Sequence, residues 1–274
     1  ESIVDNQGNH VYKIEGLKSG YYLIKDADGS ILNTDYDYYT RLILQVVNDI
    51  NITPKGDVPE VKKHVHTLKD GNYNEQVGIA INDNVYFRLS GTIPTNLDDF
   101  DTYVYEFVDV LSPGLDLVYE GNELKKAIED AYIEHEGGSK TTIDSSDYTV
   151  EYIGANSSNV NAERTFKIKF ANLKNLGTLL RTDKIVIKYK AKLNANAIIG
   201  TGTAVINNSA NITNNEVLNG NSGNENKSYL IFSNNPQGNS TGQTPFDGAR
   251  VYTYQLNINK NLRNTSCKIW SIFP

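Results

Sequence analysis

The sequence predicts an all-β protein, and three observations carry this prediction. Short segments in which apolar and polar residues alternate recur along most of the 274 residues, as expected of half-buried strands. Glycine, proline, asparagine and aspartate separate these segments and are typical of turns. Only residues 124–131 combine apolar positions at helical spacing, so we expect one short helical insertion.

Composition excludes several classes of protein. The formal net charge of −7 argues against a nucleic-acid-binding surface. Cys267 is the single cysteine, which excludes an intrachain disulfide and a cysteine-based zinc site. No apolar run approaches the roughly 20 residues of a membrane helix, and no signal peptide is visible. We expect the chain to be a piece of a longer secreted protein.

Three units are expected along the chain. Residues 1–55 contain strand patterns at 11–14, 21–24 and 38–52, and we interpret them as the C-terminal part of an N-terminal domain. Two prolines and a glycine within residues 54–59 mark a boundary. Residues 56–247 are predicted to form a complete middle domain. Residues 248–274 are expected to begin a truncated C-terminal domain, and residues 261–274 show no strand period and are assigned no function.

The first strand of the predicted middle domain carries a charge on its apolar face. Because side chains alternate along a strand, Val61, Lys63 and Val65 share one face. A buried lysine is costly unless it is paired or its charge is consumed. Two alternatives stay open: Lys62 would face inward after a one-residue shift of register, and both lysines would be solvated if the strand lay at the surface.

Two further polar residues end apolar rows. Asp109 follows Tyr103, Tyr105 and Phe107 on one face, and Asn234 follows Leu230 and Phe232 on another. A desolvated lysine has a lowered pKa and is nucleophilic as the neutral amine. A buried carboxylic acid stays protonated and polarises an amide carbonyl. Together these residues suit condensation of Lys63 with Asn234, assisted by Asp109. The alternatives are turn roles for Asp109 and Asn234, with Asn235 as the rival acceptor.

Five stretches give the chain a resemblance to a known family. They are residues 16–24 (GLKSGYYLI), 52–55 (ITPK), 108–115 (VDVLSPGL), 232–236 (FSNNP) and 251–254 (VYTY). In their order and spacing they resemble the sortase-assembled major, or backbone, pilins of Gram-positive bacteria. The resemblance implies tandem immunoglobulin-like β-sandwiches of the collagen-adhesin type, each locked by a spontaneous isopeptide bond.

The resemblance also implies roles for individual residues. Lys63 and Asn234 would form the isopeptide bond, and Asp109 would be the catalytic acid. Lys55 would be the lysine that sortase joins to the C-terminal threonine of the next subunit, although Thr53 stands where an aromatic residue is common. Lys260, at the end of the row that begins near Val251, would be the unreacted lysine of the next domain.

The implied function is structural: a shaft subunit of an extracellular pilus anchored to the cell wall. Its partners would be neighbouring pilin subunits joined by sortase, with host extracellular matrix as a further candidate partner. We expect no cofactor, no metal and no turnover. An adhesin module that binds collagen or fibrinogen is the alternative. A conventional enzyme has little support, because no nucleophile elbow, phosphate loop or histidine-based catalytic set is present.

Overall fold

The computed structural model describes most of the predicted middle domain and parts of the segment before it. The described residues are 2–4, 10–25, 27, 41–48, 58–121, 123–154, 164–199, 223–236 and 238–253. In these ranges the protein is all-β, and its helical segments are 3-10 turns at Leu97–Asp99, Leu124–Ala127 and Leu173–Leu176. The predicted fold class is therefore confirmed. No helix among these residues is long and apolar enough to cross a bilayer.

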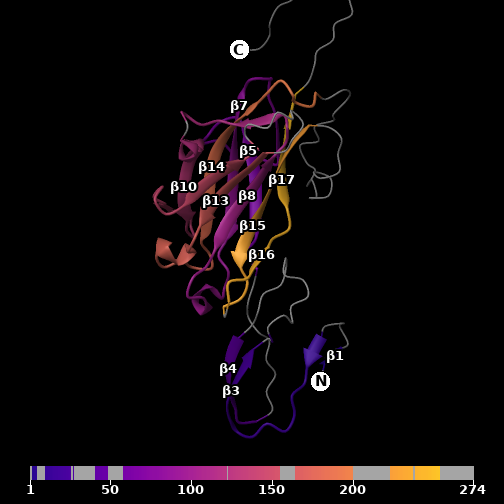
Figure 1. Ribbon diagram of the computed structural model, residues 1–274, viewed down its shortest axis with the longest axis vertical. Helices are drawn as coiled ribbons and strands as arrows, with labels where there is room; N and C mark the ends of the chain where they lie inside the picture. Colours follow the sequence, from indigo (N-terminus) through magenta and orange to yellow (C-terminus); the bar gives the residue numbers. More distant parts are fainter. Residues whose placement is uncertain are drawn as a thin grey trace, which may run out of the picture.

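Two sheets form a β-sandwich that is elongated along its strands (Figure 1). The six-stranded sheet has the order β11 (Lys140–Thr142), β10 (Ile128–Glu134), β14 (Lys184–Leu193), β7 (Asn84–Thr92) and β5 (Val61–His66), with β9 (Leu115–Leu117) paired to β14. The seven-stranded sheet has the order β12 (Thr149–Ile153), β13 (Arg164–Phe170), β8 (Tyr105–Leu111), β15 (Asn224–Ser233), β17 (Asp247–Tyr252) and β6 (Gln76–Gly78), with β16 (Thr241–Gln243) paired to β15. The pairs within both sheets are antiparallel except β17 with β6.

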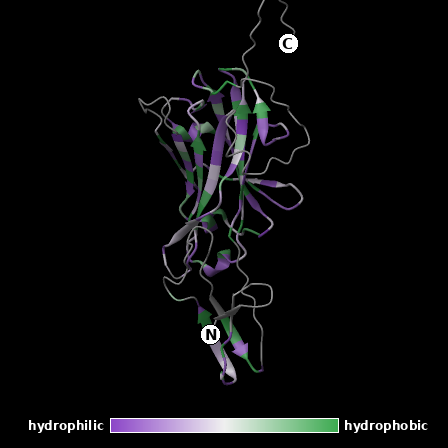
Figure 2. Ribbon diagram, turned by 90° about the vertical axis from the view of Figure 1, so that its right-hand side faces the viewer, coloured by the Kyte–Doolittle hydropathy of each residue, from purple (hydrophilic) through white to green (hydrophobic). Residues whose placement is uncertain are grey.

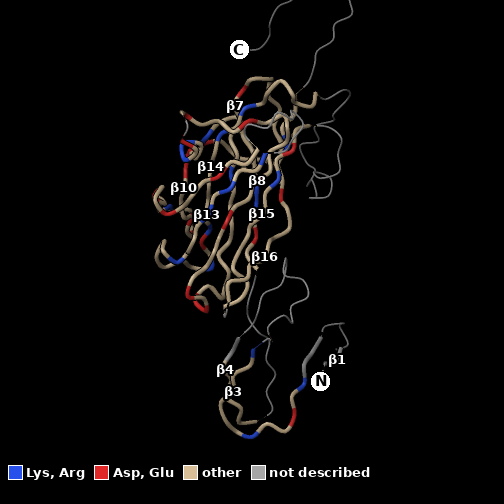
Figure 3. The backbone as a smooth tube through the Cα atoms, in the orientation of Figure 1, with Lys and Arg blue, Asp and Glu red and all other residues tan. Residues whose placement is uncertain are grey.

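The core lies between the two sheets and follows from the alternation along the strands. In β15, every second residue from Asn224 to Phe232 is buried. The hydropathy colours alternate along many of the strands in the same way (Figure 2). Both signs of charge are spread over the sandwich (Figure 3), as expected when polar side chains occupy the outward positions.

The N-terminal strands form two separate ribbons. One pairs β1 (Ser2–Val4) with β2 (His10–Tyr12), and the other pairs β3 (Gly20–Lys25) with β4 (Arg41–Val46). The β3–β4 ribbon lies beyond one end of the sandwich (Figure 1). Tyr21 and Ile43 on it are both 75% exposed, so this ribbon does not bury its apolar face within the described part of the chain.

Two predicted elements need correction. The helix expected at residues 124–131 is a 3-10 turn that ends at Ala127, and the chain continues as strand β10. Pairing of β10 with β14 prevails over the local helical spacing. In addition, Asp247–Tyr252 forms β17 of the seven-stranded sheet. The expected boundary after residue 247 therefore falls inside the sandwich, because this strand completes the sheet beside β15. The rest of the division into domains stays a prediction.

Gly91 in β7 allows the two sheets to approach each other closely. A Cβ atom at this position would lie 2.0 Å from the Tyr105 hydroxyl and 3.0 Å from a methyl carbon of Leu230. Both neighbours belong to the opposite sheet. The absence of a side chain is thus required by packing at this point of the core.

We predict that Gly91→Ala destabilises the protein by about 1–3 kcal/mol, the usual effect of overpacking a core. The measurement is the free energy of unfolding in urea. Gly78→Ala is the matched control, because a Cβ atom at Gly78 meets nothing within 4 Å. Equal stability of the two variants would contradict the close approach of the sheets at Gly91.

Candidate functional site

Strand β5 places Lys63 inside the sandwich. Val61, Lys63 and Val65 are buried, whereas Lys62 between them is exposed. Lys63 has an exposed fraction of 0%. The prediction that Lys63 faces inward is therefore confirmed, and the alternative register with Lys62 inside is excluded.

Asp247 fixes the register of this strand. Because β5 is the edge strand of its sheet, the backbone N–H of Lys63 is not used by the pairing with β7. This N–H donates a hydrogen bond of 2.7 Å to Oδ2 of Asp247, at the start of β17. The contact joins the two sheets and holds the Lys63 backbone at one position. Sequence reasoning missed Asp247, which precedes the strand pattern that was recognised.

Strand β8 brings Asp109 to Lys63 from the opposite sheet. Asp109 lies between Phe166 of β13 and Ser228 of β15 in the register of the sheet, and its side chain is fully buried. Lys63 Nζ donates a hydrogen bond to Asp109 Oδ2, and the same two atoms form the buried ion pair of the site. The structure thus brings together two of the three residues that the sequence singled out.

Aromatic rings keep water away from the amine. Lys63 Nζ lies 4.8 Å from the ring centroid of Phe87 and 5.2 Å from that of Tyr189. These two rings stack on each other at 5.4 Å, and Phe166 packs against Tyr189 at 5.2 Å. The amine therefore lies against two ring faces of its own sheet, and Phe166 of the opposite sheet packs behind Tyr189.

Burial sets the protonation state of the pair. Desolvation lowers the pKa of Lys63, against the opposing effect of the nearby Asp109 carboxyl group. Desolvation also raises the pKa of Asp109, against the opposing effect of Lys63. Both shifts favour the neutral forms, an amine and a carboxylic acid. A neutral amine is a nucleophile, and a neutral acid can donate a hydrogen bond.

Asn234 lies away from this pair. It follows the last residue of β15, and its side-chain Oδ1 accepts a hydrogen bond of 2.7 Å from Ser240 Oγ. Asp109 faces Ser228, six residues earlier on the same strand, which corresponds to roughly 20 Å at about 3.3 Å per residue. The structure therefore does not bring Asn234, or its neighbour Asn235, to Lys63.

Asn226 occupies the position beside Asp109. It faces Leu111 in the register of β8 and β15, which makes it a diagonal neighbour of Asp109 on the inward face. Its side chain is fully buried, with an exposed fraction of 0%. Sequence reasoning missed Asn226, because residues 207–226 are rich in asparagine, glycine and serine, a composition that conceals the start of a strand. The sequence pattern that could have found it is the alternation along β15, in which the even-numbered residues from Phe232 back to Asn224 face inward.

The hydroxyl group of Tyr189 connects the lysine with this asparagine. Lys63 Nζ donates a hydrogen bond of 3.0 Å to it, and Asn226 Nδ2 donates one of 2.5 Å. Among the residues that the structure describes, the buried oxygens without a hydrogen-bond partner include Asp109 Oδ1, Asn226 Oδ1 and the Oγ atom of Ser228 opposite Asp109. Four buried side chains thus meet between the sheets, Lys63 and Tyr189 from one sheet and Asp109 and Asn226 from the other.

The other predicted residues cannot be placed. Lys55 and Lys260 lie outside the described residues, so their predicted roles in subunit linkage and in the next domain stay predictions.

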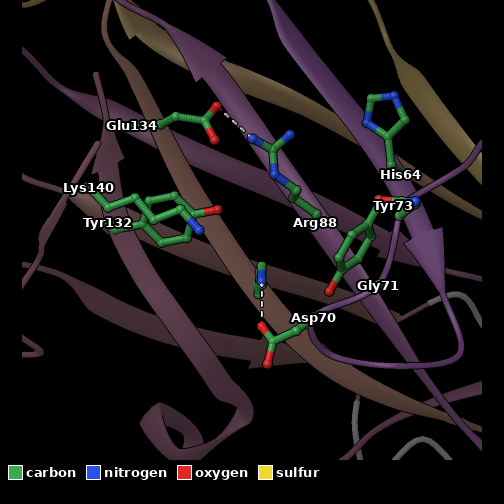
Figure 4. Close-up of a pocket in the computed structure, with 10 residues that line it drawn as sticks. His64, Asp70, Gly71, Tyr73, Arg88, Tyr132, Glu134 and Lys140 are labelled. Carbon is green, nitrogen blue, oxygen red and sulfur yellow. Dashed lines mark hydrogen bonds and ion pairs between the residues drawn. The ribbon is translucent and has the colours of Figure 1, made fainter. Parts of the chain in front are cut away.

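A polar groove lies on the outer face of the six-stranded sheet (Figure 4). Its volume is about 430 Å³. Arg88 donates to Glu134 at 2.8 Å and Lys188 pairs with Asp70 at 3.2 Å, so several of its charges are satisfied within the chain. Within the described ranges, no three His, Cys, Asp or Glu side chains are grouped so that they could hold a metal ion.

Comparison with solved structures finds likenesses at the level of the fold. The chain is similar to the C-terminal fragment of the major pilin GBS80 of Streptococcus agalactiae, at 20% identity and a TM-score of 0.45, over 72% of this chain and 57% of that one. It is similar to BcpA, the major pilin subunit of Bacillus cereus, at 13% identity and a TM-score of 0.46, over 91% and 63%. For the T6 backbone pilin of Streptococcus pyogenes the identity is 16% and the TM-score 0.49, over 92% and 49%.

The chain spans about half to three fifths of the length of these solved pilins. No family model matches the chain, and no curated protein does.

The burial of Asp109 predicts a pH dependence in a protein that lacks Lys63. In Lys63→Met, the opposing effect of the lysine on the pKa of Asp109 is lost, so this pKa rises further above its ordinary value of 3.8. The stability that the neutral Asp109 side chain contributes is fully present below pH 3.8, the ordinary pKa of aspartate. It is lost as the pH rises through the pKa that Asp109 has in the folded protein. A tenfold change in the acid dissociation constant on folding corresponds to about 1.4 kcal/mol of stability.

We therefore expect Lys63→Met to unfold at lower urea concentration at about pH 7 than at about pH 4. The double variant Lys63→Met/Asp109→Leu is the control. It lacks Asp109, so any pH dependence that it keeps comes from other titratable groups. A pH profile that is the same with and without Asp109 would contradict a raised pKa at this site.

Proposed function

We propose that this chain is a structural subunit of a covalently assembled surface pilus, and that its sandwich locks itself by an amide bond between Lys63 and Asn226. The observation that carries the proposal is the meeting of a buried lysine, a buried acid and a buried asparagine between the two sheets. The resemblance of five sequence stretches to major pilins supports the same function.

The proposed reaction is an amide exchange within one chain. The lone pair of Lys63 Nζ attacks Cγ of Asn226, and a new C–N bond forms. The bond from Cγ to Nδ2 breaks, and one proton passes from Nζ to the leaving nitrogen, which departs as ammonia. No oxidant, metal or cofactor enters this balance. The reaction occurs once per chain, so the protein is not an enzyme with turnover.

Asp109 is the acid that activates the amide. A carboxylic acid kept neutral by burial donates its proton toward the carbonyl oxygen of the acceptor, where negative charge develops. Asp109 Oδ1 and Asn226 Oδ1, which both lack a partner, are the pair that this hydrogen bond would join. The proposed acceptor is Asn226 in place of Asn234, because the structure holds Asn226 at the acid.

The cross-link suits a protein that carries tension. It would connect β5, on which the sandwich begins, with β15, which lies near its end. Lys63 and Asn226 are 163 positions apart (226 − 63). Closing a loop of this length in the unfolded chain corresponds to roughly 5 kcal/mol in the chain-entropy account. Neighbouring subunits joined by sortase through Lys55, and an extracellular, cell-wall-anchored location, complete the proposal.

The groove on the outer sheet does not favour the alternative of an adhesin. An adhesin of the collagen- or fibrinogen-binding type would need an exposed apolar trench. The groove in the described part of the chain is lined instead by charged and polar side chains such as Arg88, Glu134 and Lys188.

The cross-link predicts a mass deficit. The purified protein should weigh less than its sequence by one ammonia, because the bond forms with loss of that molecule. Intact-mass spectrometry measures this directly. Lys63→Ala, Asp109→Ala and Asn226→Ala should each show the full mass of their sequence.

Asn234→Ala is the matched control, since it removes an equally buried asparagine just beyond the other end of β15 and should keep the deficit. A wild-type protein of full mass would refute the cross-link. A deficit that disappears in Asn234→Ala and persists in Asn226→Ala would reverse the choice of acceptor.

Subunit linkage at Lys55 predicts a branched peptide in assembled polymers. Digestion and tandem mass spectrometry of polymer formed with the cognate sortase should find Lys55 joined to the carboxyl group of a threonine. Lys55→Arg keeps the charge but should leave only monomers. A joint at another lysine would contradict this assignment without affecting the internal cross-link.

A further inference from the structure

Tyr189 occupies the centre of the proposed reaction site. It lies on β14, the third strand in the order of the six-stranded sheet, and its side chain is fully buried. Its hydroxyl oxygen accepts hydrogen bonds from Lys63 Nζ at 3.0 Å and from Asn226 Nδ2 at 2.5 Å. These are the two nitrogen atoms that must exchange a proton when the amide bond forms.

The hydroxyl group also has a proton to give. Burial raises the pKa of Tyr189 well above its ordinary value, and the adjacent Asp109 acts in the same direction. The phenol is therefore protonated at neutral pH. The Tyr189 hydroxyl group thus contacts both nitrogen atoms of the proposed reaction and lies near Asp109, whose charge raises the pKa of Tyr189.

We propose that Tyr189 is a catalytic residue that carries the proton from Lys63 to the leaving nitrogen of Asn226. This role rests on the proposed cross-link. When Nζ bonds to Cγ of Asn226, the nitrogen becomes acidic and releases a proton to the Tyr189 oxygen. The same oxygen gives up its own proton to Nδ2, and the Cγ–Nδ2 bond then breaks with loss of ammonia. Tyr189 ends the reaction unchanged.

Two acids thereby act on one amide group. Asp109 donates a hydrogen bond to the carbonyl oxygen of Asn226, and Tyr189 transfers the proton from Lys63 Nζ to Asn226 Nδ2. The hydrogen bond from Nδ2 to Tyr189 also orients the amide of Asn226 so that its Oδ1 is left for the acid. The rings of Phe87 and Phe166 pack on Tyr189 from two sides, which keeps the hydroxyl group in place between its partners.

The test is the rate of cross-linking in Tyr189→Phe, which removes only the hydroxyl group. The protein is made by timed cell-free synthesis, and intact mass reports the fraction that has lost ammonia. We expect the reaction to be slowed roughly 10²-fold or more, as for loss of a positioned acid–base group. Tyr105→Phe is the matched control. It removes a hydroxyl group equally buried but bonded to Thr92 O at 3.0 Å, and should react at the wild-type rate.

The outcomes separate this role from the cross-link itself. A wild-type protein that keeps its full mass refutes both. A wild-type protein that links, with Tyr189→Phe linking as fast as Tyr105→Phe, refutes the role of Tyr189 alone. Folding is checked in the unlinked background, by thermal unfolding of Asp109→Ala with and without Tyr189→Phe.

A second variant keeps the hydroxyl group and so does not depend on the fold of Tyr189→Phe. Replacement of Tyr189 by 3-fluorotyrosine makes the phenol more acidic and leaves the ring nearly the same size. The more acidic phenol donates its proton to Nδ2 more readily and accepts one from Nζ less readily, so the overall rate should stay within about threefold of the wild-type rate. Cross-linking that is tenfold slower in this variant, with thermal unfolding in the Asp109→Ala background unchanged, would contradict the relay.

Discussion

The removal of one lysine from water is the constraint on which the rest of this sandwich depends. Lys63 has no exposed surface, and a buried ammonium costs several kcal/mol even beside a carboxylate. The structure meets this cost by placing the amine against the Asp109 carboxyl group, the Tyr189 hydroxyl group and aromatic rings, and burial shifts both pKa values toward the neutral forms. In the proposed product the amine is an amide and carries no charge. Folding would therefore bring the reacting groups together, and the cost of burying the lysine would favour the uncharged amide product.

The topology decides which residues meet. Lys63 and Tyr189 come from the six-stranded sheet, and Asp109 and Asn226 come from the seven-stranded sheet. Lys63 and Tyr189 cannot reach Asp109 and Asn226 until the two sheets have packed, because the complete site lies in the interface between the sheets. Asp247 reinforces this arrangement by binding the edge of β5 to β17. The proposed bond would then make permanent a contact that packing has already formed.

Alternation along single strands was enough to predict part of this site. It placed Lys63 and Asp109 on inward faces, and their burial confirms both predictions. It could not find Asn226, because the asparagine-rich composition before Tyr229 concealed the first residues of β15. Tyr189 escaped notice for a different reason: it lies on an apolar inward row, and only the packing of the two sheets shows that its hydroxyl group meets polar partners. The helix expected at residues 124–131 gave way to strand pairing, which depends on contacts with β14 that the local sequence does not contain.

The central claim is a bond between two particular atoms, and peptide mapping tests it most directly. The full chain is digested with a protease and the fragments are sequenced by tandem mass spectrometry. The account predicts one branched fragment in which the side chain of Lys63 is joined to the side chain of Asn226. Separate linear fragments that contain an unmodified Lys63 and an unmodified Asn226 would contradict it.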